Sequence, residues 1–163
     1  MDIARFKKLP ILGILRGGEP DEIEPLIRSV ISAGLEAMEI TMDSKDAGTL
    51  IRKAKSAAGT DLMIGAGTVL NMDLLKIAVD AGATFIVMPT LIEDVMEYCV
   101  KNVIPVFPGA LTPQEIGDLK KLRGGERYYR IRLGEYRIGL ILEGDKVVFV
   151  RFLPRKDIYR YFP

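Results

Sequence analysis

Short apolar segments alternate with amphipathic helical patterns through the first two thirds of the chain. The apolar segments are bounded by turn residues and are typical of parallel strands whose two faces are both covered. They lie at 11–16, 37–42, 62–67, 85–89 and 104–109. Between them, apolar residues recur at helical spacing, and Gly34 and Gly82 stand where helix C-caps are expected. This rhythm predicts five consecutive βα units, which form either a TIM-type barrel or a doubly wound sheet.

The last third of the chain has a different pattern. Apolar or tyrosine side chains alternate with arginines over residues 129–133, which is the period of an antiparallel strand with one face in water. Residues 134–135 (Gly-Glu) fit a two-residue hairpin turn, and residues 143–145 fit a second turn before the apolar segment 146–152. We therefore predict a three-stranded antiparallel meander, followed by the segment PRKDIYRYFP.

One predicted helix connects the two patterns. The capping box TPQE at 112–115 begins it and Gly124-Gly125 ends it, so we expect a helix over residues 112–123 that belongs to both parts. The predicted domains are a partial (β/α) barrel at 1–117 and an antiparallel sheet at 118–163, fused into one folding unit through this helix. Five parallel and three antiparallel strands leave open one mixed eight-stranded sheet or a closed barrel, in which the meander covers the edge of the fifth strand.

Charge divides the chain at the same place. Residues 118–163 carry 12 Lys and Arg against 6 Asp and Glu, whereas the 117 residues before them carry 11 against 16. The overall charge of +1 therefore hides a basic tail of +6 and an acidic front of −5. This shift in composition marks a boundary between two kinds of sequence.

The residue types that are absent limit the chemistry of the chain. Histidine, the commonest general base near neutral pH and the commonest metal ligand, does not occur, and Cys99 is the single cysteine. We therefore expect no metal site, no cofactor and no internal disulfide, and we expect a cytoplasmic location. No apolar run approaches the roughly 20 residues of a membrane span, so no membrane association is expected.

Three motifs of the front part resemble those of one enzyme family. GLEAMEIT at 34–41, IGAGTVLN at 64–71 and IPVFPGALTP at 104–113 are similar, in this order, to the class I aldolases that act on 2-keto-3-deoxy-6-phosphogluconate and 4-hydroxy-2-oxoglutarate. The resemblance covers residues 5–116. It implies the first five units of a (β/α)8 barrel.

This resemblance also implies a site. In the family the glutamate of the EIT motif is the acid–base group, which falls on Glu39, and the threonine of GAGT helps to hold the keto-acid carboxylate, which falls on Thr68. Enclosure in a barrel raises the pKa of a carboxyl group, which suits proton transfer. Arg16, at the end of the first strand, could clamp a carboxylate. At one position the chain departs from the family, which usually has arginine where this chain has Asp43.

The nucleophile of the family has no counterpart in these motifs. The family forms a Schiff base through a lysine on the sixth strand, and this chain departs from the pattern after the fifth. The front-part lysines that fall in helical patterns, where their charges are solvated, are Lys53, Lys55, Lys76 and Lys101. We therefore expect Glu39 and Thr68 to be vestigial residues of an aldolase site.

The tail resembles a second family. LKKLRGGERYYRIRLGEYRIGLILEGDKVVFVRFLPRKDIYRYFP at 119–163 is similar to the C-terminal half of RelE-type toxins, which are ribosome-dependent mRNA endonucleases. The resemblance implies RNA-binding arginines at Arg130, Arg132 and Arg137. It also implies cleavage residues at Arg137, Arg155 and Tyr159, in which arginine stabilises phosphate charge and tyrosine lies near the cleaved nucleotide.

The toxin resemblance is also incomplete. The opening strand of that family and the first helix of its helical pair are absent, and Pro154 stiffens the loop that presents Arg155. Arg130 and Arg132 also fit the solvated face of an antiparallel strand with no further role. Weak, salt-sensitive RNA binding is the most that we expect.

We interpret the chain as a hybrid of two families, engineered or selected for folding, without efficient inherited catalysis. Whether it is an enzyme stays open, and the missing lysine and the shortened toxin part argue against it. One alternative is an RNA-binding or weakly RNA-cleaving module in the tail, and another is a remnant keto-acid site in the front part. The expected partners are a second or third copy of the chain, as a dimer or trimer, and RNA.

Overall fold

The computed structural model describes residues 1–109, 120–121, 128–133, 136–143 and 146–162. The chain divides into two compact units, Met1–Gly109 and Ala110–Pro163. Counted over these units, the first carries 11 Lys and Arg against 15 Asp and Glu, a net charge of −4, and the second carries 12 against 7, a net charge of +5.

The first unit is built on a parallel sheet of five strands in the order β1-β2-β3-β4-β5. The strands are β1 (Gly13–Leu15), β2 (Ala37–Thr41), β3 (Met63–Gly67), β4 (Ile86–Met88) and β5 (Val106–Pro108). Each lies within the range that the apolar pattern predicted, so the five parallel strands are confirmed. The sequential strand order is that of a barrel wall, because a doubly wound sheet reverses its order at a switch point.

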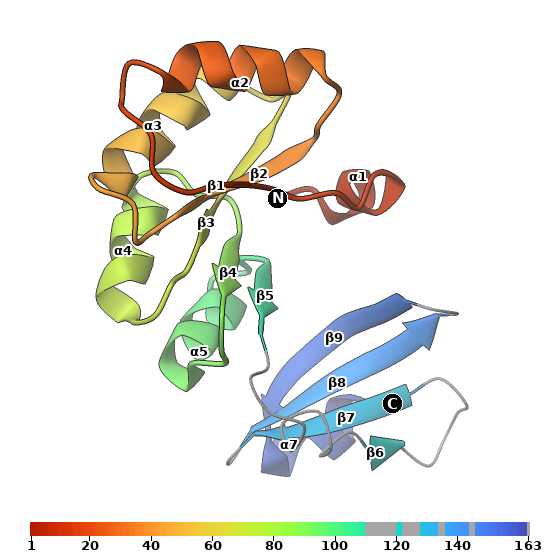
Figure 1. The fold of residues 1–163 in the computed structure, drawn as a ribbon. Coiled ribbons are helices and arrows are strands. Elements are labelled where there is room, and N and C mark those ends of the chain that lie inside the picture. Colours follow the sequence, from red (N-terminus) through yellow and green to blue (C-terminus); the bar gives the residue numbers. More distant parts are fainter. Residues whose placement is uncertain (110–119, 122–127, 134–135, 144–145, 163) are drawn as a thin grey trace. The chain divides into compact units, whose positions relative to one another are not determined.

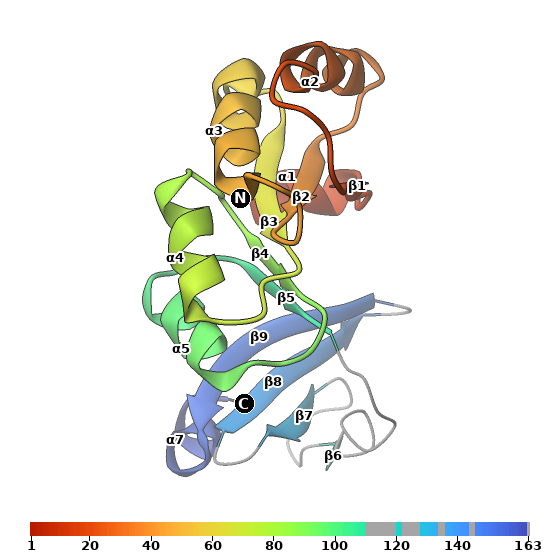
Figure 2. The same cartoon turned by 60° about the vertical axis from the view of Figure 1, so that its left-hand side comes forward.

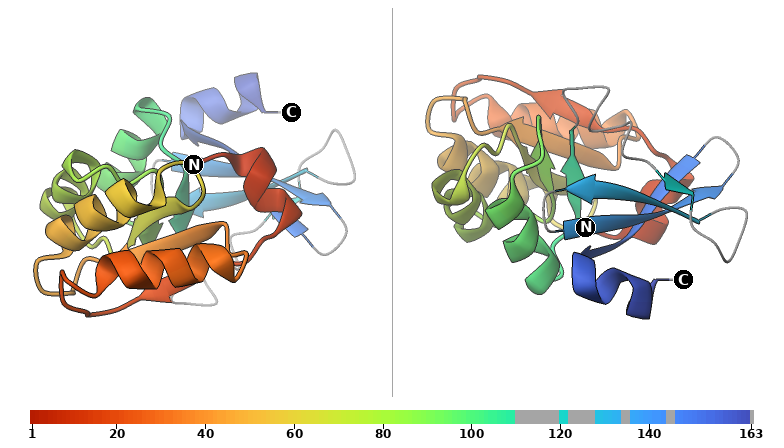
Figure 3. Two further views of the ribbon diagram at one scale, coloured as in Figure 1. Left: turned by 90° about the horizontal axis from the view of Figure 1, so that it is seen from above. Right: turned by 90° about the horizontal axis from the view of Figure 1, so that it is seen from below.

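Helices α2 (Ile23–Ser32), α3 (Ala47–Ala58), α4 (Met72–Asp80) and α5 (Glu93–Lys101) follow the first four strands. All four lie on one face of the sheet, and α1 (Ile3–Lys8) lies on the other side (Figure 1). The view from above in Figure 3 shows the same separation. Their apolar stripes are buried, and alternation along the strands places Ile40, Ile64 and Ile86 on the helix-covered face, where each is fully buried. This one-sided cover is that of a barrel segment.

The opposite face of the sheet carries a second apolar cluster near the amino ends of the strands. Ala37, Met63 and Phe85 form its buried centre, and Phe6 of α1 and Phe107 of β5 pack against it. The ring of Phe107 meets the rings of Phe6 and Phe85 edge-on, with centroids 5.7 and 5.9 Å away. The cluster therefore fixes α1 across the amino end of the sheet.

Polar contacts also hold α1, a helix that the sequence patterns did not predict. Arg5 Nε donates to Glu36 Oε2 at 2.9 Å, and the Arg5 guanidinium also donates to the carbonyl oxygens of Thr60 and Asp61. Glu36 precedes β2, and Thr60 and Asp61 precede β3. Arg5 thus joins α1 to the amino ends of two strands.

Three helices of the first unit end in the same way. Gly34 after α2 and Gly82 after α4 have φ of 82° and 94°, as predicted for C-cap glycines. Val103 after α5 has φ of 56° and donates to the carbonyl oxygen of Val100, just as Gly34 donates to that of Ile31. A β-branched residue in this left-handed conformation is strained, and the Val103 side chain is also 88% exposed.

The described residues of the second unit form an antiparallel sheet in the order β6-β7-β8-β9 and helix α7. These described elements are β6 (Lys120–Lys121), β7 (Tyr128–Leu133), β8 (Tyr136–Glu143), β9 (Lys146–Pro154) and α7 (Arg155–Tyr161). Leu133 pairs with Tyr136 and Glu143 pairs with Lys146, so two residues separate the strands at each predicted turn. The turn residues 134–135 and 144–145 lie outside the described residues. The described strands form two sheets, and one mixed sheet or a closed barrel stays a prediction.

The predicted helix at 112–123 is wrong at its end. Residues 120–121 form strand β6, in which Lys120 lies opposite Arg130 and Lys121 lies opposite Tyr129. Hydrogen bonds to the edge of β7 determine this conformation, and such long-range pairing leaves no periodic signal in a local stretch of sequence. The predicted capping box at 112–115 and the stop at Gly124-Gly125 lie outside the described residues.

Helix α7 lies against one face of this sheet, as Figures 2 and 3 show. Phe162, directly after α7, is buried and meets the ring of Tyr128 edge-on, with centroids 5.7 Å apart. A Cβ atom on Gly139 would lie 2.7 Å from the Phe162 ring, so the helix can pack this closely only against glycine. The register between β8 and β9 shifts next to Gly139, which is typical of a β-bulge.

Candidate functional site

The residues that the front part of the sequence singled out gather at the carboxyl end of the parallel sheet. Arg16 directly follows β1, Asp43 lies just after β2, and Thr68 directly follows β3. Because neighbouring parallel strands end at the same edge, these side chains belong to one rim, the usual place of active sites in barrels of this type. Glu39 lies within β2 itself, opposite Ile14 of β1 and Gly65 of β3.

Glu39 is the buried carboxyl group of this rim. Its side chain is 4% exposed, and Oε2 has no hydrogen-bond partner among the described residues. Burial raises the pKa of Glu39 above its usual value, and the positive charge of Arg16 partly offsets this rise. An unpartnered buried carboxyl with a raised pKa keeps its proton to higher pH than an ordinary glutamate and can exchange it with a ligand.

Two glycines of β3 make room for this arrangement. A Cβ atom on Gly67 would lie 2.2 Å from Glu39 Oε1, so any other residue at that position would displace the carboxyl group. A Cβ atom on Gly65 would lie 2.3 Å from the ring of Phe85. The glycines of the IGAGT segment thus serve the packing of Glu39 and of the aromatic cluster.

Thr68 is held in an unusual backbone conformation. Its φ is 56°, in the left-handed region that β-branched residues seldom adopt. The neighbouring residues fix it, since Gly67 accepts from the Met42 N–H at 2.8 Å and the Val69 N–H donates to the Val87 carbonyl at 3.2 Å. Strain of this kind is often found at ligand sites. Thr68 lies at the rim directly after β3, and its role in holding a carboxylate stays a prediction.

The loops after β1 and β2 are joined by two successive contacts. Arg16 Nη1 lies 3.4 Å from Asp43 Oδ2, and the Gly17 N–H donates to Ser44 Oγ at 2.8 Å. Ser44 Oγ is also 3.1 Å from Thr41 Oγ1 at the end of β2. The sequence patterns did not identify Ser44, and a serine in a loop carries no signal for such a contact.

A lysine able to form a Schiff base is not found on the strands of this unit. None of β1 to β5 contains lysine. Lys53, Lys76 and Lys101 are exposed on α3, α4 and α5, and Lys55 is half-buried on α3. These ammonium groups belong to the helical layer, on the face opposite to Glu39.

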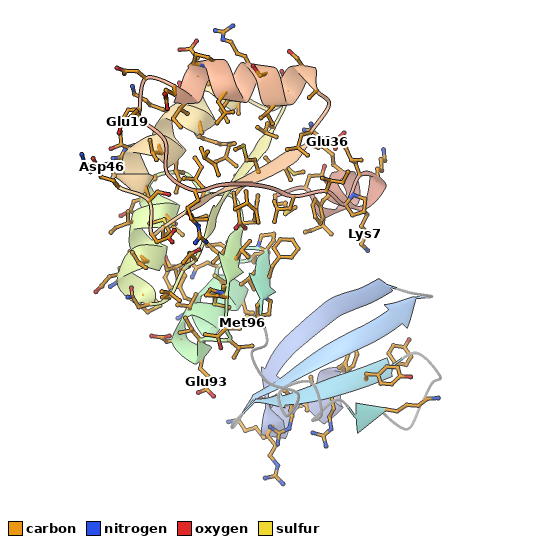
Figure 4. All side chains as sticks on the ribbon, viewed as in Figure 1. Lys7, Glu19, Glu36, Asp46, Glu93 and Met96 are labelled. Carbon is orange, nitrogen blue, oxygen red and sulfur yellow. The ribbon has the colours of Figure 1, made fainter. Side chains whose placement is uncertain are left out.

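A pocket of about 330 Å³ lies beside this rim. It is formed at the start of α3 and by α4, with Asp46, Thr49 and Arg52 on one side and Leu74 and Ile77 on the other. Asp46 precedes α3 with φ of 53° (Figure 4). Ser44, which joins the loops of the rim, also lines this pocket, whereas Glu39, Arg16 and Thr68 do not, so the pocket adjoins the rim without containing these three residues.

The second unit brings some of its predicted residues together in register. Arg132 lies opposite Arg137, and Arg130 lies opposite Gly139, across β7 and β8. Arg137 is buried, with 3% exposed, Arg130 is half-buried, and Arg155 is exposed at the start of α7. Arg132 and Tyr159 have described backbones in β7 and α7, and their side chains lie outside the described part of the structure.

The described part of the chain contains neither a cluster of metal ligands nor a membrane-spanning helix. Among those residues, no group of three or more His, Cys, Asp or Glu is placed to hold a metal ion. Cys99 is buried on α5, and burial raises the pKa of its thiol to about 11. No described helix combines the length and apolar character that crossing a bilayer requires.

The tail is similar to a toxin. Toxin RelE3 of Methanocaldococcus jannaschii is 56% identical over 46 residues, which are 28% of this chain and 52% of the toxin. The predicted resemblance of the tail to RelE-type toxins is therefore confirmed. It extends to about half of the toxin's length.

The front part is similar to aldolases in sequence and in structure. The 2-dehydro-3-deoxy-6-phosphogalactonate aldolase of Escherichia coli is 36% identical over 108 residues, which are 66% of this chain and 53% of that enzyme. The crystal structure of the 2-keto-3-deoxy-6-phospho-gluconate aldolase of Zymomonas mobilis matches with a TM-score of 0.62 and 28% identity, over 69% of this chain and 54% of that one. The chain spans about half the length of the aldolases that it matches.

The family assignment rests on the match to a family model. The family model for aldolases, described as KDPG and KHG aldolase, matches residues 3–123. These residues include all five parallel strands and the rim that carries Arg16, Glu39 and Thr68. The chain therefore belongs to the KDPG and KHG aldolase family.

Proposed function

We propose that the first unit binds small 2-keto acids, such as pyruvate, at the carboxyl ends of β1 to β3, and that it does not complete an aldol reaction. The supporting observation is Glu39, whose buried Oε2 has no partner among the described residues. Leaving a buried carboxyl oxygen unpaired costs stability, and a ligand that supplies a hydrogen bond recovers part of that cost.

The chemistry of the rim suits a keto acid. A protonated Glu39 donates a hydrogen bond to the ligand carbonyl oxygen, and Arg16 attracts the ligand carboxylate. An ionised Glu39 can instead take a proton from the carbon next to the carbonyl, which leaves an enolate with its charge on the carbonyl oxygen. In a lysine-dependent aldolase an iminium group accepts those electrons, and none of β1 to β5 carries a lysine that could form one. We therefore expect binding and, at most, slow proton exchange.

Borohydride trapping tests the missing step. The chain is incubated with pyruvate and borohydride, and its intact mass is measured. We expect no adduct, whereas a reduced pyruvate adduct on a lysine would contradict the proposal.

A ligand titration tests the site itself. Pyruvate methyl resonances are followed by NMR as protein is added, for the wild type, Glu39→Gln and the control Glu36→Gln at the other end of the sheet. We expect saturable binding that weakens in Glu39→Gln and not in Glu36→Gln. Binding should strengthen as the pH falls through the raised pKa of Glu39, because protonation removes a negative charge that faces the ligand. Equal binding by all three proteins would remove Glu39 from the site.

We also propose that the chain is a hybrid in which neither inherited reaction is efficient. Two observations support this: it matches about half of each aldolase relative and about half of a RelE toxin. The aldolase half carries no lysine on its described strands, and Arg137, an expected toxin residue, is buried. Assays for aldol cleavage and for mRNA cleavage are expected to give no turnover above background. Robust turnover in either assay would contradict it.

RNA binding by the second unit is a second candidate. It is favoured by the exposed cations Arg155, Lys156 and Arg160 on α7, in a unit of net charge +5. Fluorescence anisotropy with a single-stranded RNA should show binding that falls steeply between about 50 mM and 200 mM salt. Arg155→Ala should weaken it, and Lys7→Ala on α1 serves as the matched loss of one exposed charge. Arg137→Ala is a poorer test, because removing a buried guanidinium also affects folding. Binding that is insensitive to salt would contradict the candidate.

A further inference from the structure

The cation of the rim already has an anionic neighbour. Arg16 Nη1 lies 3.4 Å from Asp43 Oδ2, and the two side chains are 66% and 43% exposed. Arg16 also acts on Glu39, whose raised pKa it partly lowers. One guanidinium thus stands within electrostatic reach of two carboxyl groups.

We propose that Asp43 determines the specificity of this rim, by lowering its affinity for ligands that carry a carboxylate. The inference rests on the proposed keto-acid site. Asp43 neutralises the charge that would attract a ligand carboxylate, and its own charge repels that group. An uncharged carbonyl ligand meets neither effect.

The geometry indicates that Asp43 acts on ligand binding through its charge more than by occupying the hydrogen-bond donors of Arg16. The 3.4 Å separation is longer than the 2.7–2.9 Å of a charge-assisted hydrogen bond, so donors of the guanidinium are left for a ligand. The Gly17 N–H to Ser44 Oγ bond keeps the two loops together beside the ion pair. Replacing Asp43 should therefore leave Arg16 near its present position with its charge unopposed.

The expected change in pyruvate affinity follows from the partial exposure of the Arg16 and Asp43 side chains. Ion pairs between partly exposed side chains typically change an equilibrium by about two- to fivefold. Asp43→Asn should therefore tighten pyruvate binding by about two- to fivefold. It should also lower the pKa of Glu39, because Arg16 then acts on that carboxyl group without an opposing charge.

The test compares pyruvate with methyl pyruvate, its uncharged ester, in NMR titrations of three proteins. They are the wild type, Asp43→Asn, and Asp61→Asn, which removes the same charge from an exposed position before β3, at the amino end of the sheet. We expect tighter pyruvate binding in Asp43→Asn alone and unchanged binding of the ester in all three. Asp43→Ala, checked by its thermal melt, repeats the test if the asparagine variant folds poorly.

The outcomes separate the two proposals. If pyruvate binds the wild type and Asp43→Asn equally, the role of Asp43 is refuted and the keto-acid site stands. If both asparagine variants tighten binding alike, the effect is one of net charge and the role of Asp43 is again refuted. If no protein binds pyruvate, the keto-acid site and the inference that rests on it fail together.

Discussion

Val103 has a backbone conformation that is unfavourable for valine. Its φ of 56° is the one that Gly34 and Gly82 adopt after two other helices of the same unit. A side chain in this region costs roughly 1 kcal/mol, and the exposed valine gains little packing in return.

We expect Val103→Gly to stabilise the first unit by roughly 1 kcal/mol, less the entropy that glycine adds to the unfolded chain. Urea unfolding followed by circular dichroism measures the change. The matched reverse variant, Gly82→Val, should destabilise. A glycine variant that is less stable than the wild type would show that the valine side chain contributes to packing.

Glu39 should make stability depend on pH. Its pKa in the folded chain is raised above the usual value, so the folded state binds more protons than the unfolded state between the two values. The free energy of unfolding then falls as the pH rises through this window. At higher pH the loss of stability from burying the ionised Glu39 carboxylate remains in full. We expect Glu39→Gln to be more stable than the wild type at pH 7, with the difference vanishing below the usual pKa. Urea unfolding at several pH values measures this, and a constant difference would contradict it.

At the scale of elements, the docking of α7 depends on one glycine of β8. A Cβ atom on Gly139 would lie 2.7 Å from the ring of Phe162. We expect Gly139→Ala to destabilise the second unit by about 1–3 kcal/mol through overpacking. Phe162→Leu in the same chain should recover part of the loss, because the smaller side chain leaves room. Thermal melts of the single and double variants check this, and additive losses would contradict the proposed clash.

The sequence predicted those elements whose signal is local. The five parallel strands and the C-caps at Gly34 and Gly82 follow from periodicity and from glycine conformation. Helix α1 and strand β6 were missed because distant partners stabilise them: Glu36 and the carbonyl oxygens of Thr60 and Asp61 hold α1, and β7 holds β6.

The same distinction applies to the rim. The family motifs predicted site roles for Glu39 and Thr68, which stay predictions, and the strand order puts Arg16 at the same end of the sheet. The hydrogen bond from the Gly17 N–H to Ser44 Oγ and the ion pair of Arg16 with Asp43 depend on how the loops after β1 and β2 fold. No spacing in the sequence indicates them.

At the scale of the whole molecule, the prediction of one folding unit can be tested by calorimetry. We expect a single transition with equal calorimetric and van't Hoff enthalpies. Two transitions would show that the barrel segment and the antiparallel sheet unfold independently. Repeating the melt at several protein concentrations also tests the predicted dimer or trimer, because dissociation on unfolding makes the midpoint depend on concentration.

The division of charge between the units gives the chain an uneven electrostatic character. The first unit carries −4 and the second +5, so a net charge of +1 describes neither. At low ionic strength such a chain should adsorb to both cation- and anion-exchange resins near neutral pH, through different parts of its surface. At physiological salt, where the Debye length is about 8 Å, each unit presents its own sign of charge to a partner. We therefore expect positively charged surfaces to bind the first unit and negatively charged surfaces to bind the second.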